Sequence, residues 1–188
     1  MHLRLAILAS ILLFLPTTAF AGQSDLDRGE IRVETTDVAG SSVPRIIVTG
    51  VIDAPPSAVW AIVSDCNRYV GRMPRIEAAR EISRSGSTVL CEVTVGLPFP
   101  MSNLTARTTA THTTGPPQWK REWTMIEGDY KTNDGSWILT TFQGNPDRTL
   151  AIYSLHAEPN NRVPNSIRRR AQENSMPGII ERLRELTQ

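Results

Sequence analysis

The sequence has few of the residues on which most catalytic and metal sites depend. Its 188 residues include two cysteines and three histidines, with no CxxC, HxH or HExxH spacing and no GxSxG nucleophile elbow. These absences argue against a zinc site, a thioredoxin-like redox site and a serine hydrolase. We therefore interpret His112 and His156 as polar residues at strand ends, and we expect neither a metal nor a cofactor.

An excess of charge of either sign is also missing. Once Arg4 is set aside with the leader described below, 19 basic and 19 acidic side chains remain. A chain with this balance has no general attraction for nucleic acid or an anionic membrane, so we expect no nucleic-acid partner. The run Arg168-Arg169-Arg170 is interpreted as a solvated helix face.

No apolar run reaches the length of about 20 residues that a membrane-spanning helix needs. The run from Leu5 to Leu15 follows Arg4 and precedes Ala19-Phe20-Ala21, a small-x-small pattern. This layout predicts a signal peptide over residues 1–21, cleaved after Ala21, and hence a secreted, periplasmic protein. Such a compartment permits a Cys66–Cys91 disulfide, although two unpaired cysteines fit the sequence equally well.

The mature chain begins with a predicted hairpin. Apolar alternation indicates strands over 31–35 and 45–52, so residues 22–44 supply an N-terminal strand and turn to one domain whose main part is 45–188. Pro55 and Pro56 end the second strand, because proline donates no ladder hydrogen bond. Proline suits the first turn of a helix, and a short helix is predicted to close near Asp65.

A six-strand meander and a long helix account for the rest. Period-two patterning predicts strands at 78–84, 88–97, 101–112, 118–127, 130–142 and 148–158, joined by short turns. An amphipathic helix over 164–186 follows, with a kink at Pro177-Gly178. The predicted fold class is α+β, with a curved antiparallel sheet wrapped around the C-terminal helix and a cavity where the two do not close completely.

Similarity to a known family is concentrated in three segments, VIDAPPSAVWAIVSDCNRYVGRMPRI, VGLPFP and WTMIEGDYKTNDGSWIL. They resemble the START-like (SRPBCC) superfamily, and within it the polyketide cyclase/dehydrase and coenzyme Q-binding branch, over about residues 45–187. The resemblance implies a helix-grip fold around a hydrophobic tunnel. Members bind lipids, sterols, isoprenoid quinones, polyketides or plant hormones, and only some are enzymes, so family alone does not fix function.

The expected concave face of the sheet supplies candidate ligand-binding residues. In a filled domain the same aromatic and aliphatic side chains would simply be core. The candidate cavity residues are Trp123, Met125, Trp137, Leu139, Arg107, Ile179 and Leu183. Arg107 is included because an inward arginine can hold a carboxylate or phosphate headgroup.

The cavity entrance is predicted at an apolar hairpin tip and the kink of the last helix. These segments either gate the cavity or pack against neighbouring elements. The candidate entrance residues are Tyr69, Pro98, Phe99, Met101 and Pro177.

We expect a monomer that binds and transports a hydrophobic small molecule of lipid, sterol or isoprenoid/quinone type, with transient membrane contact. We assign no catalytic residue. An acid/base enzyme of the cyclase or dehydratase type is an alternative, and it predicts an inward polar pair with a shifted pKa. A protein-interaction module with a filled interior is another.

Overall fold

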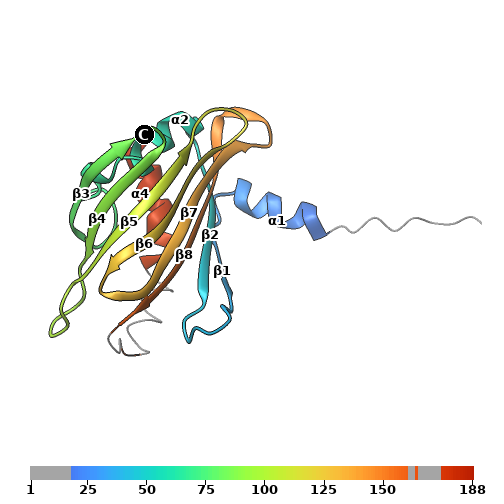
Figure 1. Cartoon of the computed structure of the whole chain (residues 1–188). Coiled ribbons are helices and arrows are strands. Elements are labelled where there is room, and N and C mark those ends of the chain that lie inside the picture. Colours follow the sequence, from blue (N-terminus) through green and yellow to red (C-terminus); the bar gives the residue numbers. More distant parts are fainter. Residues whose placement is uncertain (1–17, 161–163, 165–174) are drawn as a thin grey trace, which may run out of the picture.

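The protein folds as one curved sheet that wraps around helices on its concave face (Figure 1). A computed structural model describes residues 18–160, 164 and 175–188. All pairs in the eight-stranded sheet are antiparallel, in the order β1-β2-β8-β7-β6-β5-β4-β3. The predicted α+β helix-grip fold is confirmed.

The elements have the following bounds: α1 Thr18–Asp27, β1 Arg32–Thr36, β2 Arg45–Ile52, α2 Pro56–Val63, η1 Cys66–Arg68, β3 Ile76–Ser85, β4 Thr88–Val95, β5 Leu104–Thr113, β6 Trp119–Gly128, β7 Tyr130–Phe142, β8 Asn145–Pro159 and α4 Pro177–Leu186.

Two predicted segments, the signal peptide and the last helix, lie partly outside the described residues. Residues 1–17 of the predicted signal peptide lie outside it, and α1 runs across the predicted cleavage site after Ala21. Residues 165–174 of the predicted last helix also lie outside it. Where the description resumes, α4 begins at Pro177, whose missing N–H costs nothing in a first turn. No helix in the described ranges has the length and apolar character needed to cross a bilayer.

The entry into α2 follows from its two prolines. Pro55 occupies the N-cap position in an extended conformation, and Pro56 starts the helix. The helix buries Val59, Ile62 and Val63 against the concave face of the sheet. The motif that ends β2 therefore also turns the chain over the sheet.

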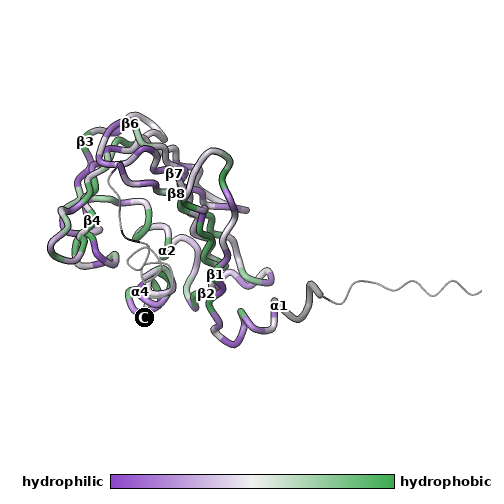
Figure 2. The backbone as a smooth tube through the Cα atoms, turned by 90° about the horizontal axis from the view of Figure 1, so that it is seen from below, coloured by the Kyte–Doolittle hydropathy of each residue, from purple (hydrophilic) through white to green (hydrophobic). Residues whose placement is uncertain are grey.

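The main core lies at one end of the sheet. Seen from below, the sheet curves around α2 and α4 (Figure 2). Side chains of β2, β7 and β8 pack there against both helices, and Leu139 and Leu183 are fully buried. α4 approaches β2 closely because Gly50 has no side chain; a Cβ at Gly50 would lie 2.6 Å from Cγ2 of Ile180.

We expect Gly50→Val to lower the free energy of unfolding by about 1–3 kcal/mol, because the added side chain must displace Ile180 or the whole helix. Urea denaturation measures the change. Gly178→Ala is the matched control, since a Cβ at Gly178 meets no atom within 4 Å. Equal stability of wild type and Gly50→Val would contradict the close packing of α4 on β2.

Candidate functional site

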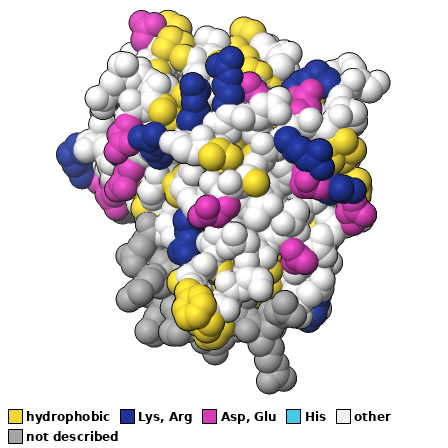
Figure 3. Space-filling model, turned by 90° about the vertical axis from the view of Figure 1, so that its left-hand side faces the viewer, with side chains coloured by type: hydrophobic (Ala, Val, Ile, Leu, Met, Phe, Trp, Pro, Cys, Tyr) yellow, Lys and Arg dark blue, Asp and Glu magenta, His cyan; other side chains and the backbone are white. Residues whose placement is uncertain are grey.

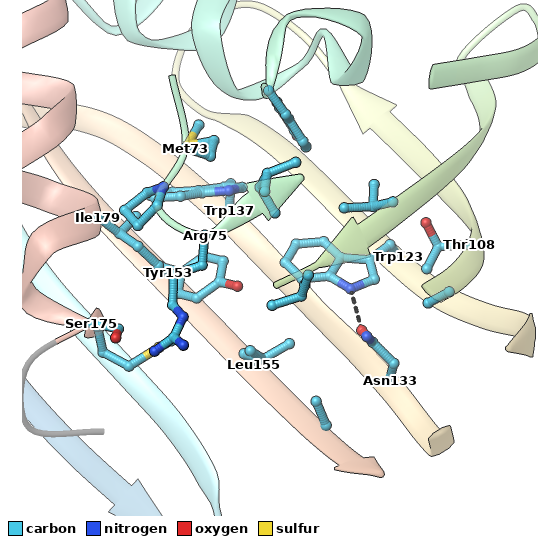
Figure 4. A pocket seen from close by; sticks show the side chains of 18 of the residues that line it. Met73, Arg75, Thr108, Trp123, Asn133, Trp137, Tyr153, Leu155, Ser175 and Ile179 are labelled. Carbon is cyan, nitrogen blue, oxygen red and sulfur yellow. Dashed lines mark hydrogen bonds between the residues drawn. The ribbon is translucent and has the colours of Figure 1, made fainter. Parts of the chain in front are cut away.

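A cavity of about 260 Å³ lies beside the main core, under the half of the sheet that α2 and α4 do not fill (Figure 4). Its walls come from β3 to β8, from the connection at Met73–Arg75 and from Ser175, Met176 and Ile179 next to and within α4. The size is close to the lower end of the range of about 300–1,000 Å³ for small-molecule sites.

Side-chain size explains why space remains at this place. The concave face of β5 carries the small residues Ala106 and Thr108, which are both buried and line the cavity. On the next strands the same face carries Trp123, Trp137 and Tyr153. The small side chains of β5 leave the gap, and the aromatic ones form its opposite wall.

The aromatic wall is held in place by specific contacts. Tyr153 packs against Trp137 with a centroid distance of 4.7 Å and against Trp123 at 5.9 Å. Nε1 of Trp123 donates to Oδ1 of Asn133 at 3.1 Å (Figure 4). Gly135 lets this indole lie on the β7 backbone, since a Cβ there would be 2.4 Å from Cζ2 of Trp123. The rings therefore cannot easily collapse into the space.

The connection between α2 and β3 closes one side of the cavity. Cys66 and Cys91 form a disulfide, which joins η1 to β4. Tyr69 follows η1 and donates its hydroxyl proton to the carbonyl of Val63 at 2.6 Å. Burial raises the pKa of Tyr69, and Arg121 partly offsets that rise. The bridge and this hydrogen bond place Tyr69 and the following chain in the wall.

Arg121 brings a positive charge to the apolar wall. It is 3% exposed and lines the cavity. Nη1 lies 2.7 Å from Nε2 of His112 and donates to the carbonyl of Ser64 at 3.3 Å. Because guanidinium only donates, Nε2 of His112 is the acceptor. Nη2 contacts Sγ of Cys91 at 3.3 Å.

His112 is held in its neutral form by its surroundings. Burial, together with the nearby positive charges of Arg121 and Arg84, lowers its pKa to about 4. The ring also packs edge-on against Trp60, with a centroid distance of 5.1 Å. His112 is therefore a neutral acceptor for Arg121 at pH 7. It is a buried residue with a defined partner, which the expected strand-end role did not anticipate.

Two tyrosine hydroxyls add polarity to the wall. Tyr130 and Tyr153 both line the cavity. Burial raises the pKa of Tyr130 to about 12 and the pKa of Tyr153 still further. Both groups therefore stay protonated at neutral pH and can donate a hydrogen bond to a ligand.

Several predicted site residues line the cavity, while others lie in its surroundings. Tyr69, Trp123, Trp137 and Ile179 are in the wall. Leu139 of β7 and Leu183 of α4 are fully buried in the main core, where the helices pack on the sheet. Met125 packs beside Leu104, Ala106 and Tyr130 in a separate cluster. Leu139 and Leu183 are therefore corrected to core positions, and Met125 to a partly buried position beside the wall, because sequence alternation cannot show which part of a face borders the cavity.

The prediction that Arg107 faces the cavity is wrong. Ala106 and Thr108 point inward, so Arg107 points outward, where it forms ion pairs with Glu92 and Glu127. Figure 3 shows basic and acidic side chains side by side over this outer surface. The error is one step of strand register, which exchanges the two faces of a strand.

The predicted entrance is only partly at the cavity. Leu97 lines it, but Pro98, Phe99 and Met101 do not, and Phe99 is 96% exposed. The tip therefore projects away from the wall instead of covering it. Pro177 is also outside the wall, although the adjacent Met176 is part of it.

Arg121 and Tyr153 are the main wall residues that the candidate set missed. Arg121 is two residues before Trp123 on β6 and so shares its face, which the alternation already indicated. Tyr153 follows from pairing, because it lies opposite Trp137 in the β7–β8 register. For Tyr153 the missing information was the strand register, whereas the alternation was sufficient for Arg121.

A second polar cluster lies on the other face of β8. Oγ of Ser41 is 3.1 Å from Nε2 of His156, and Nδ1 of His156 is 3.5 Å from Oδ1 of Asp134. The order is that of a catalytic triad, but Ser41 donates its proton to Oε2 of Glu158 at 2.6 Å. With that proton held by Glu158, Oγ of Ser41 is left as an acceptor for Nε2 of His156, and the cluster holds the β1–β2 loop on the sheet. Throughout the described part of the chain, no group of three His, Cys, Asp or Glu residues could hold a metal ion.

Removal of the disulfide by the double change Cys66→Ser and Cys91→Ser should cost about 3 kcal/mol of stability, as expected for a closed loop of 25 residues. Urea denaturation of the oxidised wild type, the reduced wild type and the variant measures it. Thiol titration of denatured protein provides the control. Two titratable thiols in wild-type protein that has not been treated with a reductant would contradict the disulfide.

We expect stability to fall as the pH is lowered from 6.5 to about 4. In this range the unfolded state binds a proton at His112 that the native state does not, so acid favours unfolding by about 2–3 kcal/mol. His112→Gln keeps an acceptor for Arg121 but removes the titration. Urea denaturation at several pH values should give a shallower pH dependence for the variant, and identical curves would refute the assignment.

Comparisons with known proteins agree with this architecture. The family model described as "Polyketide cyclase / dehydrase and lipid transport" matches residues 52–184. A search of curated protein sequences found no significant match.

Solved structures with the same fold come from bacteria and from humans. A STAR-related lipid transfer protein from Xanthomonas axonopodis is 18% identical, with a TM-score of 0.72 over 84% of this chain and 94% of that one. Human StAR-related lipid transfer protein 5 is 10% identical, with a TM-score of 0.70 over 91% and 97%.

The Zhui aromatase/cyclase from Streptomyces sp. R1128 is 14% identical, with a TM-score of 0.60 over 84% of this chain and 94% of that one. At these identities the structures show a shared fold. Together with the family match over most of its length, they establish that the chain belongs to the polyketide cyclase/dehydrase and lipid transport family of the START-like superfamily.

Proposed function

We propose that the protein binds a hydrophobic small molecule in the cavity lined by Trp123, Trp137 and Tyr153, and carries it outside the cytoplasm. The observation that carries the proposal is the partly enclosed, mainly apolar space of about 260 Å³ beside an otherwise well-filled core. An interior of this kind is costly unless something occupies it, because protein cores normally pack without such voids.

The energetics favour an apolar ligand. Transfer of apolar surface from water into such a site is favourable by about 25 cal/mol per Å². The packing of Tyr153 against both tryptophans and the Trp123–Asn133 hydrogen bond support a wall that exists before binding. Less free energy is then lost in ordering side chains on binding.

The comparisons support binding as the general activity. The names of the Xanthomonas and human structures describe lipid transfer, and the family description includes lipid transport. We extend this activity to the present protein and propose that it also transfers its ligand.

An extracytoplasmic location is part of the proposal. It is supported by the signal-peptide pattern over residues 1–21 and by the Cys66–Cys91 disulfide, which is typical of oxidising compartments. The exposed Phe99 at the β4–β5 tip supports the expected transient contact with a membrane surface.

The two alternatives have weaker support. Arg121 and His112 form an inward polar pair, as an acid/base enzyme requires, but His112 and the described carboxylates are not in the cavity wall. A binding module with a filled interior does not account for the cavity. We therefore propose a carrier.

A larger side chain that takes up space in the cavity should weaken ligand binding. We expect Thr108→Phe to weaken binding of the uncharged fluorophore N-phenyl-1-naphthylamine at least tenfold, because the ring takes the space of the ligand. Fluorescence titration measures it. Thr109→Phe is the matched control on the outer face of the same strand. Absence of probe binding to wild type, together with no copurified apolar mass in native mass spectrometry, would refute the proposal.

A further inference from the structure

The guanidinium of Arg121 is a buried positive charge without a negative partner in the described part of the chain. The residue is 3% exposed, and its contacts are a carbonyl oxygen, a neutral imidazole and a disulfide sulfur. Arginine keeps its charge in proteins, and buried charges are normally paired with charges of opposite sign. Arg121 therefore departs from the usual pattern.

The titratable groups around Arg121 do not supply the missing charge. Glu81 is close enough for Arg121 to help lower its pKa, but the largest cause is its hydrogen bonding to Arg84, which takes both of its oxygens at 3.0 and 2.6 Å. His112 is neutral. Tyr69 donates its proton to Val63 and stays un-ionised, since burial raises its pKa.

Arg121 has two N–H donors without an acceptor among the described residues, and a carboxylate has two oxygens to accept them. Arginine has five N–H donors. Nη1 contacts Ser64 and His112, and Nη2 contacts Cys91. Within the described residues, no acceptor takes the Nε proton or the second Nη2 proton. Two donors on one planar group match the two oxygens of a carboxylate.

We propose that Arg121 binds the carboxylate of an anionic amphiphile whose apolar body occupies the cavity against Trp123, Trp137 and Tyr153. The inference rests on the proposed function and specifies its ligand class. The ligand carboxylate supplies the negative charge that the described residues lack at this place. An uncharged lipid would leave the charge of Arg121 without a counter-ion. The site therefore selects for negative charge as well as for apolar surface.

The cavity also limits the size of the ligand. Its volume of about 260 Å³ is close to the lower end of the range of about 300–1,000 Å³ for small-molecule sites. A single medium-length chain or a small aromatic acid fits this space, whereas two acyl chains exceed it. The proposed class is therefore a single-chain or compact monocarboxylic acid.

Displacement of N-phenyl-1-naphthylamine by decanoate and by decanol tests the inference, because the two competitors share a chain length and differ in charge. At pH 7.5 we expect wild type to bind decanoate at least tenfold more tightly than decanol. Arg121→Met should reduce this ratio at least tenfold, and Arg121→Lys should retain part of it.

Two control variants separate Arg121 from other arginines. Arg107→Met lies on the outer face of β5 and should leave the ratio unchanged. Arg75 is exposed at the cavity edge, where Nε donates to the carbonyl of Gly96 at 3.2 Å. Loss of the decanoate preference in Arg75→Met but not in Arg121→Met would place the headgroup at the edge and overturn the inference.

A measurement on wild type keeps the test independent of the folding of any variant. With decanoate labelled with ¹³C at the carboxyl carbon, NMR titration should give a lower pKa for the bound acid than for the free acid, because the adjacent cation favours the ionised form. An unchanged or raised pKa would overturn the inference.

The outcomes also separate the two proposals. Binding of the fluorophore with equal displacement by decanoate and decanol would refute the carboxylate inference and leave the carrier proposal standing. Absence of fluorophore binding to wild type would refute both.

Discussion

The contact of Ile180 with Gly50 determines how much of the concave face the helices can cover. Because Gly50 has no Cβ, α4 lies directly on β2, at one side of the sheet. α2 packs beside it over β7 and β8. Much of the concave face from β3 to β6 therefore has no helix over it. The cavity is the consequence of this one-sided packing.

The cavity remains open because contacts with neighbouring residues hold the side chains of its wall in place. Gly135 lets Trp123 lie on the backbone, Asn133 orients the indole, and Tyr153 stacks against it. On the opposite strands, small residues face the same space. Preorganisation of this kind is what a binding site requires, since side chains that are already ordered lose little entropy when a ligand enters.

Electrostatics distinguish this cavity from a simple apolar space. The environment that makes His112 neutral also isolates the charge of Arg121, since the low pKa of the imidazole removes it as a second cation and leaves it as an acceptor. The disulfide contributes a second uncharged contact through Cys91. In the part of the chain that the structure describes, the cation thus has uncharged contacts but no counter-ion, and this combination underlies the proposed preference for acids.

The sequence by itself determined the order of elements, the turn through Pro55 and Pro56 into α2, the meander and the α+β class. These features depend on local patterns: proline geometry, period-two alternation and turn residues. It also placed Trp123 and Trp137 on the concave face. Only the tertiary structure decided that Arg107 points outward, that Leu139 and Leu183 lie in the packed core, and that Arg121 has no anionic partner among the described residues. Those facts depend on strand register and on which residues distant in the chain meet in space, and neither is contained in local sequence patterns.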